Sequence, residues 1–250
     1  MEAIDQLISY NKTTGLLQSV AGRNAWDQET MMPERGVSTR AAQLAELAGV
    51  LHAKRTSPEL VDKVKSVEND NLDANQKAVM REICRDVYKA QKVPASLLKE
   101  IAKEASLGHQ TWAKARKEQN FSLFHPVLER MIGLKKEYAK CLGFKDSPYE
   151  ALLDEFEPGA ELDDVASLLG DLEMPLRNLA ERIKSKSRPQ VSLQGDYGAE
   201  DQLKLAKVVS EQLGYAFAAG RLDLAVHPFT SGGTPGDVRI TTRVNPKDFQ

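Results

Sequence analysis

DANQKAVMREICRDVYKAQKVPASLLKEIAKEASLGHQTW, residues 73–112, decides the fold class. Apolar side chains recur in it every three or four positions, which is the period of an amphipathic α-helix. Asp73 stands three residues before Gln76, the spacing of a capping box at the amino end of a helix. Pro94 lies where a second helix can begin, because the first turn of a helix tolerates proline. The stretch therefore predicts two helices, whose apolar faces carry Val79, Ile83, Val87 and Ala90 in the first and Leu97, Ile101, Ala105 and Trp112 in the second.

The same helical period continues on both sides of this stretch. It predicts further helices over about residues 36–55, 126–142, 148–157, 162–183 and 199–213. Pro175 predicts a kink, and Gly143 is a plausible helix stop. The polar residues 185–198 contain proline and glycine and predict a long loop. Most of the chain is therefore expected to be helical.

The pattern changes after residue 214. Residues 220–226 and 237–244 look extended, and the second segment alternates apolar and polar side chains like a half-buried strand. The glycine-rich residues 231–236 between them predict a turn. The fold class is therefore mainly α, a multi-helix array with a small antiparallel β-hairpin or sheet near the carboxyl end. We expect one domain over residues 1–250, helical from 1 to 214, with the hairpin region at 220–246.

Composition narrows the class of protein. The 34 basic and 36 acidic residues give a net charge of −2, without the basic excess typical of nucleic-acid binding. No apolar run approaches the roughly 18 residues that a membrane span needs, and the acidic amino terminus does not resemble a secretory signal. Cys84 and Cys141 lie far apart among apolar residues, which favours reduced thiols. We expect a cytoplasmic globular protein with no nucleic-acid or membrane partner.

The four histidines do not form a metal-binding motif. His52, His109, His125 and His227 are scattered, and no two share the i, i+4 spacing that places both imidazoles on one helical face. The first three are interpreted as structural or surface residues. The sequence also lacks a G-x-S-x-G elbow and a phosphate-binding glycine loop. Neither a complete catalytic set nor a metal site is therefore predicted from these residues.

Polar side chains concentrate between residues 221 and 249. Arg239 and Arg243 are four positions apart on a predicted strand and would face the same side. Two guanidinium groups aimed into a groove can bind a carboxylate through paired hydrogen bonds. The alternative is a solvated strand face beside a glycine-rich turn, and the residues by themselves leave both interpretations open.

Several ordered segments resemble one known family. HPF at 227–229 is followed by DVRIT at 237–241, which matches a D-x-R-x-T pattern. WDQETMMP at 26–33, RAAQ at 40–43, SPYEALLDEFEPG at 147–159 and RLD at 221–223 agree with it. Together they resemble the amino-terminal half of the M32, or carboxypeptidase Taq, family of metallocarboxypeptidases over about residues 26–249.

The resemblance implies a helical protein with a deep groove lined by a small sheet, which removes single residues from the carboxyl ends of peptides. It also implies zinc or a similar divalent metal in the full-length family, and it allows a homodimer. By resemblance the groove is bordered by His227, Pro228, Phe229, Asp237, Arg239 and Thr241. Arg239 either orients substrate or holds the sheet, and Asp237 is either its structural partner or a backbone cap.

The family's H-E-x-x-H motif does not occur in this sequence. In the family it follows the D-x-R-x-T strand, and the printed chain stops at Gln250, before that point. We therefore expect a fragment of a zinc carboxypeptidase that is inactive alone, binds no metal, and exposes an apolar surface where a missing half would pack. The alternative is a non-catalytic helical module that binds peptides or pairs with a peptidase subunit.

Overall fold

The mainly α fold class is confirmed. The computed structural model describes residues 3–67, 71–186 and 195–247. Its helices, in chain order, are α1 (Ala3–Thr30), η1 (Glu34–Gly36), α2 (Val37–Arg55), α3 (Pro58–Val67), α4 (Ala74–Lys92), α5 (Ala95–Lys117), α6 (Phe121–Leu142), α7 (Pro148–Leu153), α8 (Leu162–Lys184), α9 (Ala199–Gln212) and η2 (Phe217–Ala219). The strands are β1 (Gly220–Leu224), β2 (Thr230–Thr234) and β3 (Asp237–Thr242). Within the described part of the chain, no helix is long and apolar enough to cross a membrane.

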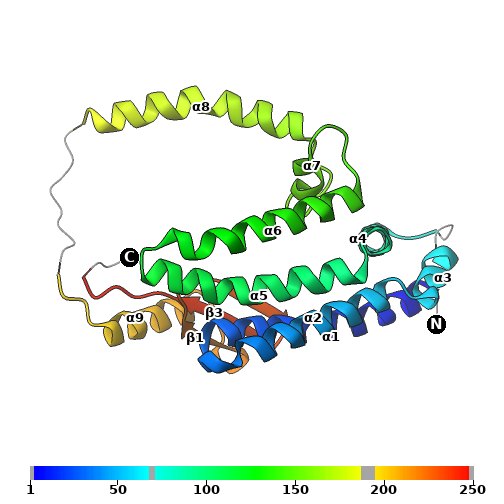
Figure 1. The fold of residues 1–250 in the computed structure, drawn as a ribbon, viewed down its shortest axis with the longest axis horizontal. Coiled ribbons are helices and arrows are strands. Elements are labelled where there is room, and N and C mark those ends of the chain that lie inside the picture. The colour runs from blue at the N-terminus through cyan, green and yellow to red at the C-terminus, as the bar shows by residue number, and fades with distance from the viewer. Residues whose placement is uncertain (1–2, 68–70, 187–194, 248–250) are drawn as a thin grey trace.

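Long helices packed side by side form the body of the molecule (Figure 1). α2 packs on α1 and α5, and α5 packs in turn on α6, while β2 contacts α1. One buried cluster joins α1, α3 and α4 through residues such as Ile4, Leu7 and Val67. A second joins the start of α5 to α6 through Leu97 and Leu134. Ile83 and Val87 of the first predicted stripe and Leu97 and Ile101 of the second belong to these clusters. Val79 and Ala105 are exposed instead.

The predicted capping box of α4 is confirmed. The Gln76 N–H donates to Asp73 Oδ1 at 2.8 Å, and the Asp73 N–H donates to Gln76 Oε1 at 3.0 Å. Each side chain thus satisfies a backbone donor that the helix leaves unpaired. Gly143 ends α6 with a φ of 85°, a left-handed conformation that suits glycine.

Two helix predictions need correction. α6 begins at Phe121 instead of Pro126, because the Asn120 side chain accepts a hydrogen bond from the Ser122 N–H and caps the helix earlier. α7 ends at Leu153 instead of about residue 157, because Asp154 caps it and its carboxylate accepts from the Gly159 N–H in the turn that follows. The predicted helix over 162–183 agrees with α8, which runs from Leu162 to Lys184 with Pro175 inside it. Of the predicted loop at 185–198, residues 187–194 lie outside the described part of the chain.

The strands of the sheet are paired differently from the predicted hairpin. The sheet order is β1-β3-β2: β1 runs parallel to β3, with Gly220 opposite Val238, and β2 runs antiparallel to it. The prediction that residues 220–226 and 237–244 pair as a hairpin is therefore wrong, and part of the predicted turn is strand β2. The physical reason is a tight turn at Gly236, whose φ is 94°, so that the nearest preceding segment becomes the antiparallel partner of β3. The 12 residues from 225 to 236 are long enough to cross between parallel strands.

Candidate functional site

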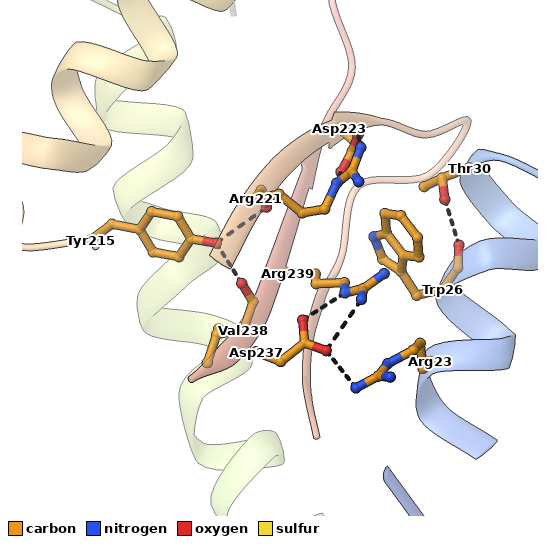
Figure 2. Close-up of polar contacts among 9 residues, drawn as sticks. All are labelled: Arg23, Trp26, Thr30, Tyr215, Arg221, Asp223, Asp237, Val238 and Arg239. Carbon is orange, nitrogen blue, oxygen red and sulfur yellow. Dashed lines mark hydrogen bonds and ion pairs between the residues drawn. The ribbon is translucent and has the colours of Figure 1, made fainter. Parts of the chain in front are cut away.

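Trp26 of α1 anchors the sheet to the helices. Its side chain is buried, and two arginines from neighbouring strands lie near its ring (Figure 2). The Arg239 guanidinium carbon is 4.1 Å from the ring centroid and that of Arg221 is 5.1 Å away. Cations at such distances are attracted to the ring's π electrons, and more strongly where water is excluded. This contact positions β1 and β3 against α1.

Asp237 links β3 to α1 by ion pairs. Its Oδ1 accepts from Arg239 Nε at 2.8 Å, and its Oδ2 accepts from Arg23 Nη2 at 2.7 Å (Figure 2). The hydrogen bond from Arg239, followed by the charges of Arg239 and Arg23, lowers the pKa of Asp237. Asp237 is thus the partner of Arg239, one of the two roles left open by the sequence. Arg23 was missed by sequence reasoning, although it precedes Trp26 by three positions and so shares its helical face.

A second arginine–aspartate pair lies on β1. Arg221 Nε and Nη2 donate to the Asp223 carboxylate at 2.6 and 2.7 Å, and Asp223 is buried. The hydrogen bond with Asp223 raises the pKa of Arg221. The Tyr215 hydroxyl lies 2.5 Å from the Val238 carbonyl oxygen and 3.1 Å from that of Arg221 (Figure 2). The tyrosine therefore joins the ends of β1 and β3.

The H-P-F and D-x-R-x-T segments are bonded to each other through Thr241. The Thr241 hydroxyl accepts from the Phe229 N–H at 2.7 Å and donates to the Phe229 carbonyl at 2.9 Å. The Thr241 N–H donates to the same carbonyl at 3.0 Å. Since Thr241 is buried, these bonds replace ones that water would otherwise make. They hold Phe229, which directly precedes β2, against the central strand β3.

His227 is exposed and lies beside aromatic side chains of α5. Its ring stands edge-on to Trp112, with 6.4 Å between centroids, and Trp112 lies 5.5 Å from His109. His109 Nε2 is 3.6 Å from a Glu29 carboxylate oxygen. His52, in contrast, lies within 3.0 Å of the Ala90 carbonyl, consistent with the structural role predicted for it. His227 and His109 therefore lie against the same tryptophan, Trp112, whereas His52 has different neighbours.

The structure separates Arg239 from Arg243. β3 ends at Thr242, and Arg239 turns to Trp26 and Asp237. Arg243 borders an open hollow of about 650 Å³ together with Pro228 and Arg116. The two arginines that the sequence placed on one face therefore have different neighbours. The structure thus brings together Asp237 with Arg239 and Phe229 with Thr241, and it leaves His227 and Pro228 at the surface.

Within the described part of the chain, the donor groups do not form a zinc site. Among residues 3–67, 71–186 and 195–247, no three His, Cys, Asp or Glu side chains converge closely enough to hold a metal ion. Zinc sites in proteins use three or four such ligands brought to one point. The side chains described above therefore hold the sheet and the H-P-F segment in position. No reaction step through a metal is assigned to them.

A helical array whose small mixed sheet carries joined H-P-F and D-x-R-x-T segments is the architecture of a helical metallocarboxypeptidase. The sequence model of the carboxypeptidase Taq (M32) metallopeptidase family matches residues 6–250. The chain belongs to this family.

Individual relatives agree with this assignment. Thermostable carboxypeptidase 1 of Thermus thermophilus is 36% identical over 256 residues, covering 96% of this chain and 50% of that protein. Carboxypeptidase 1 of Bacillus subtilis is 33% identical over 231 residues, covering 90% of this chain and 46% of its own length. The chain therefore spans about half the length of the relatives it matches.

Solved structures show the same fold. The crystal structure named BsuCP superposes with a TM-score of 0.93 at 28% identity, covering 99% of this chain and 51% of that one. A structure of Pyrococcus furiosus carboxypeptidase gives a TM-score of 0.83 at 29% identity, covering 99% and 51%. The similarity extends over nearly all of this chain.

Proposed function

We propose that this chain forms one wall of the peptide groove of a zinc-dependent carboxypeptidase and that it has no peptidase activity by itself. The observation that carries the proposal is the joining of the H-P-F and D-x-R-x-T segments by Thr241 on a sheet held to Trp26. In this proposal the metal, its ligands and the general base belong to a region corresponding to the second half of the relatives. The substrates are peptides with a free carboxyl terminus, and the setting is the cytoplasm.

The contacts among Arg239, Asp237 and Trp26 give the wall a fixed shape. Arg239 is held between Asp237 and Trp26, so its guanidinium is already committed to positioning the sheet. This favours a structural role for Arg239 over direct substrate binding. The exposed ring of His227 and the neighbouring Pro228 are the parts of the motifs that a substrate can reach. The wall would thus contact a peptide through the H-P-F segment while β3 supports it from behind.

Exposed apolar side chains on α8 and α9 support a larger assembly. α8 has no buried residue, and it lies apart from α5 and α6 (Figure 1). The exposed apolar side chains are Leu168, Leu169, Leu172, Met174, Leu176, Leu179 and Ile183 on α8 and Leu205, Val208 and Val209 on α9. Large exposed apolar faces commonly mark interaction surfaces. We assign this one to the polypeptide that corresponds to the relatives' second half.

The alternative is a non-catalytic helical module that binds peptides or pairs with a peptidase subunit, including a second copy of this chain. The same α8 face favours it, since a self-association surface would also be apolar. The two proposals predict different results when the second half of a relative is added: the first predicts peptide hydrolysis, and the second predicts assembly without hydrolysis.

The deciding experiment is reconstitution. The 250-residue chain is mixed or co-expressed with the second half of Bacillus subtilis carboxypeptidase 1, and release of carboxyl-terminal amino acids from an N-blocked peptide is measured with zinc and with a chelator. We expect chelator-sensitive release from the mixture and none from either part. The matched control is a chain with Leu172→Glu and Leu179→Glu on α8, which should assemble less. Release by the 250-residue chain alone would refute the proposal, and assembly without release would favour the non-catalytic module.

A further inference from the structure

A hollow of about 320 Å³ lies where α4 meets the end of α2 and the beginning of α5. α4 is viewed nearly end-on in Figure 1, whereas α2 and α5 run across the view, so α4 crosses these two helices. None of the residues around the hollow belongs to the sheet or to the H-P-F segment. We propose that this hollow binds a small uncharged molecule with an apolar ring and one hydrogen-bond donor. The site is separate from the peptide-groove wall and does not depend on the proposed function.

The space exists because each of the three helices contributes an alanine. Ala48 on α2, Ala90 on α4 and Ala102 on α5 all line the hollow. A methyl group at these positions leaves room that a larger side chain would fill, and closely packed protein interiors rarely leave such room. The other apolar side chains of the lining are Leu51, Val93, Leu98 and Ile101. The volume lies at the lower end of the range for small-molecule sites, about 300–1,000 Å³, and fits a molecule of one or two rings.

The charges of the lining cancel. Arg55 and Lys89 are its two cations, and Asp86 and Glu155 are its two carboxylates. Arg55 Nη2 is 3.7 Å from Asp86 Oδ2, and Lys89 Nζ is 2.7 Å from a carboxylate oxygen of Asp154. A charged ligand would therefore lose its hydration and find no counter-charge in exchange. An uncharged ligand is selected for this reason.

His52 supplies a hydrogen-bond acceptor. Its Nε2 lies 2.8 Å from the Val93 carbonyl oxygen and 3.0 Å from that of Ala90. A nitrogen within hydrogen-bond distance of two carbonyl oxygens carries the proton, so Nδ1 of the neutral imidazole is the acceptor. The Tyr138 hydroxyl donates to Glu155 Oε1 at 2.6 Å, and burial, followed by this hydrogen bond, raises the pKa of Tyr138. The phenol thus stays uncharged and committed to Glu155, and a ligand N–H or hydroxyl is matched by His52 Nδ1.

The test measures binding of three probes to the 250-residue chain at pH 8 by isothermal titration calorimetry. Indole has an apolar ring system, no charge and one N–H donor, 1-methylindole lacks the donor, and indole-3-carboxylate adds a charge. We expect indole to bind about fivefold more tightly than 1-methylindole, because one hydrogen bond is lost in the latter. We expect it to bind about tenfold or more tightly than the carboxylate, because burying an uncompensated charge is costly. Indole should also shift the His52 Nδ1 resonance in ¹⁵N NMR spectra.

Substitutions locate the site. Ala48→Leu and Ala102→Leu fill the hollow from opposite helices and should each weaken indole binding by about tenfold or more, with urea unfolding used to check that each variant is folded. If one of them does not fold, the other supplies the same measurement. The matched control is Ala105→Leu, one turn further along α5 at an exposed position outside the lining, and it should bind indole like the unchanged chain.

A second control excludes the exposed apolar face of α8. The chain with Leu172→Glu and Leu179→Glu should bind indole with unchanged affinity, since neither residue lines the hollow. No detectable binding of indole, equal binding of the three probes, or an unchanged His52 Nδ1 resonance would each overturn the proposal. Unchanged binding by both filled variants, or loss of binding in the α8 variant, would overturn it as well. These measurements need no peptide hydrolysis, so their result is independent of the reconstitution experiment.

Discussion

Asp154 is the residue at which the geometry yields the most quantitative prediction. Its Oδ2 lies 2.9 Å from Arg85 Nη2 and 2.7 Å from Lys89 Nζ, both on α4, and its Oδ1 accepts from the Gly159 N–H at 3.0 Å. Burial raises the pKa of Asp154, but the hydrogen bonds from Lys89, Gly159 and Arg85 outweigh it and lower the pKa to about 2. The carboxylate thus ties the end of α7 to α4. Asp154→Asn removes its charge and keeps its size.

The size of the effect follows from the pKa. The difference between the ordinary pKa of 3.8 and the folded-state pKa of about 2 corresponds to about 2.4 kcal/mol in the free energy of unfolding, at about 1.36 kcal/mol per pKa unit. Because a third of the side chain is exposed, solvent screening reduces this to about 1–2 kcal/mol. The folded-state pKa is below the unfolded one, so the stabilisation is fully present above the unfolded pKa of 3.8. It is lost as the pH falls through about 2, and about half remains at pH 3.

The assay is urea unfolding followed by far-ultraviolet circular dichroism at pH 7, 5 and 3. Asp154→Asn should lower the free energy of unfolding by about 1–2 kcal/mol at pH 7 and 5, and by about half as much at pH 3. The control is Asp146→Asn, since the Asp146 side chain is 78% exposed and forms an ion pair with its neighbour Lys145. It should change the free energy of unfolding by less than about 0.5 kcal/mol. Equal losses in the two variants, or a loss for Asp154→Asn that is the same at pH 7 and pH 3, would refute the reasoning.

Three further substitutions test the sheet and its anchor, and a fourth on α6 serves as a control, each measured by urea unfolding. Trp26→Ala should cost about 3–5 kcal/mol, because a buried indole is removed; a loss below about 1 kcal/mol would contradict its anchoring role. Gly220→Ala should weaken the sheet, since its β-carbon would overlap the backbone of β3, whereas Gly133→Ala on α6 has open space and should stabilise by about 0.5–1 kcal/mol. The opposite order of these two would refute the β1–β3 pairing. Thr241→Val should cost about 1–3 kcal/mol because the Phe229 N–H loses its acceptor, although the Phe229 carbonyl keeps its bond from the Thr241 N–H; a neutral result would show that water replaces the hydroxyl.

Local signals account for the parts of the fold that were predicted well. The Asp73 capping box and the helix stop at Gly143 depend on residues within one or two turns, so the sequence pattern contains the necessary information. The start of α6 was misplaced because Pro126 is a strong signal, while the cap at Asn120 is a weaker one that the folded helix nevertheless uses.

Among the site residues, too, the motifs are visible in the sequence and the distant partners are not. The motif containing Asp237, Arg239 and Thr241 is visible in the sequence, but the partners Arg23 and Trp26 are more than 200 residues away from it in the chain. No local pattern shows that α1 lies against β3. The pairing of Arg243 with Arg116 at one hollow likewise depends on how α5 packs beside the sheet.

By itself the sequence determined the helical class, most helix positions, the family resemblance and the absence of an H-E-x-x-H motif, because helical periodicity, capping and motifs are encoded in neighbouring residues. Only the tertiary structure decided that β1 and β3 are parallel, that Arg239 is held by Trp26 and Asp237, and that Arg243 lies beside Arg116 at one hollow. Strand pairing and side-chain partners depend on contacts between segments far apart in the chain, and the energies of those contacts are set by packing, which no local pattern contains.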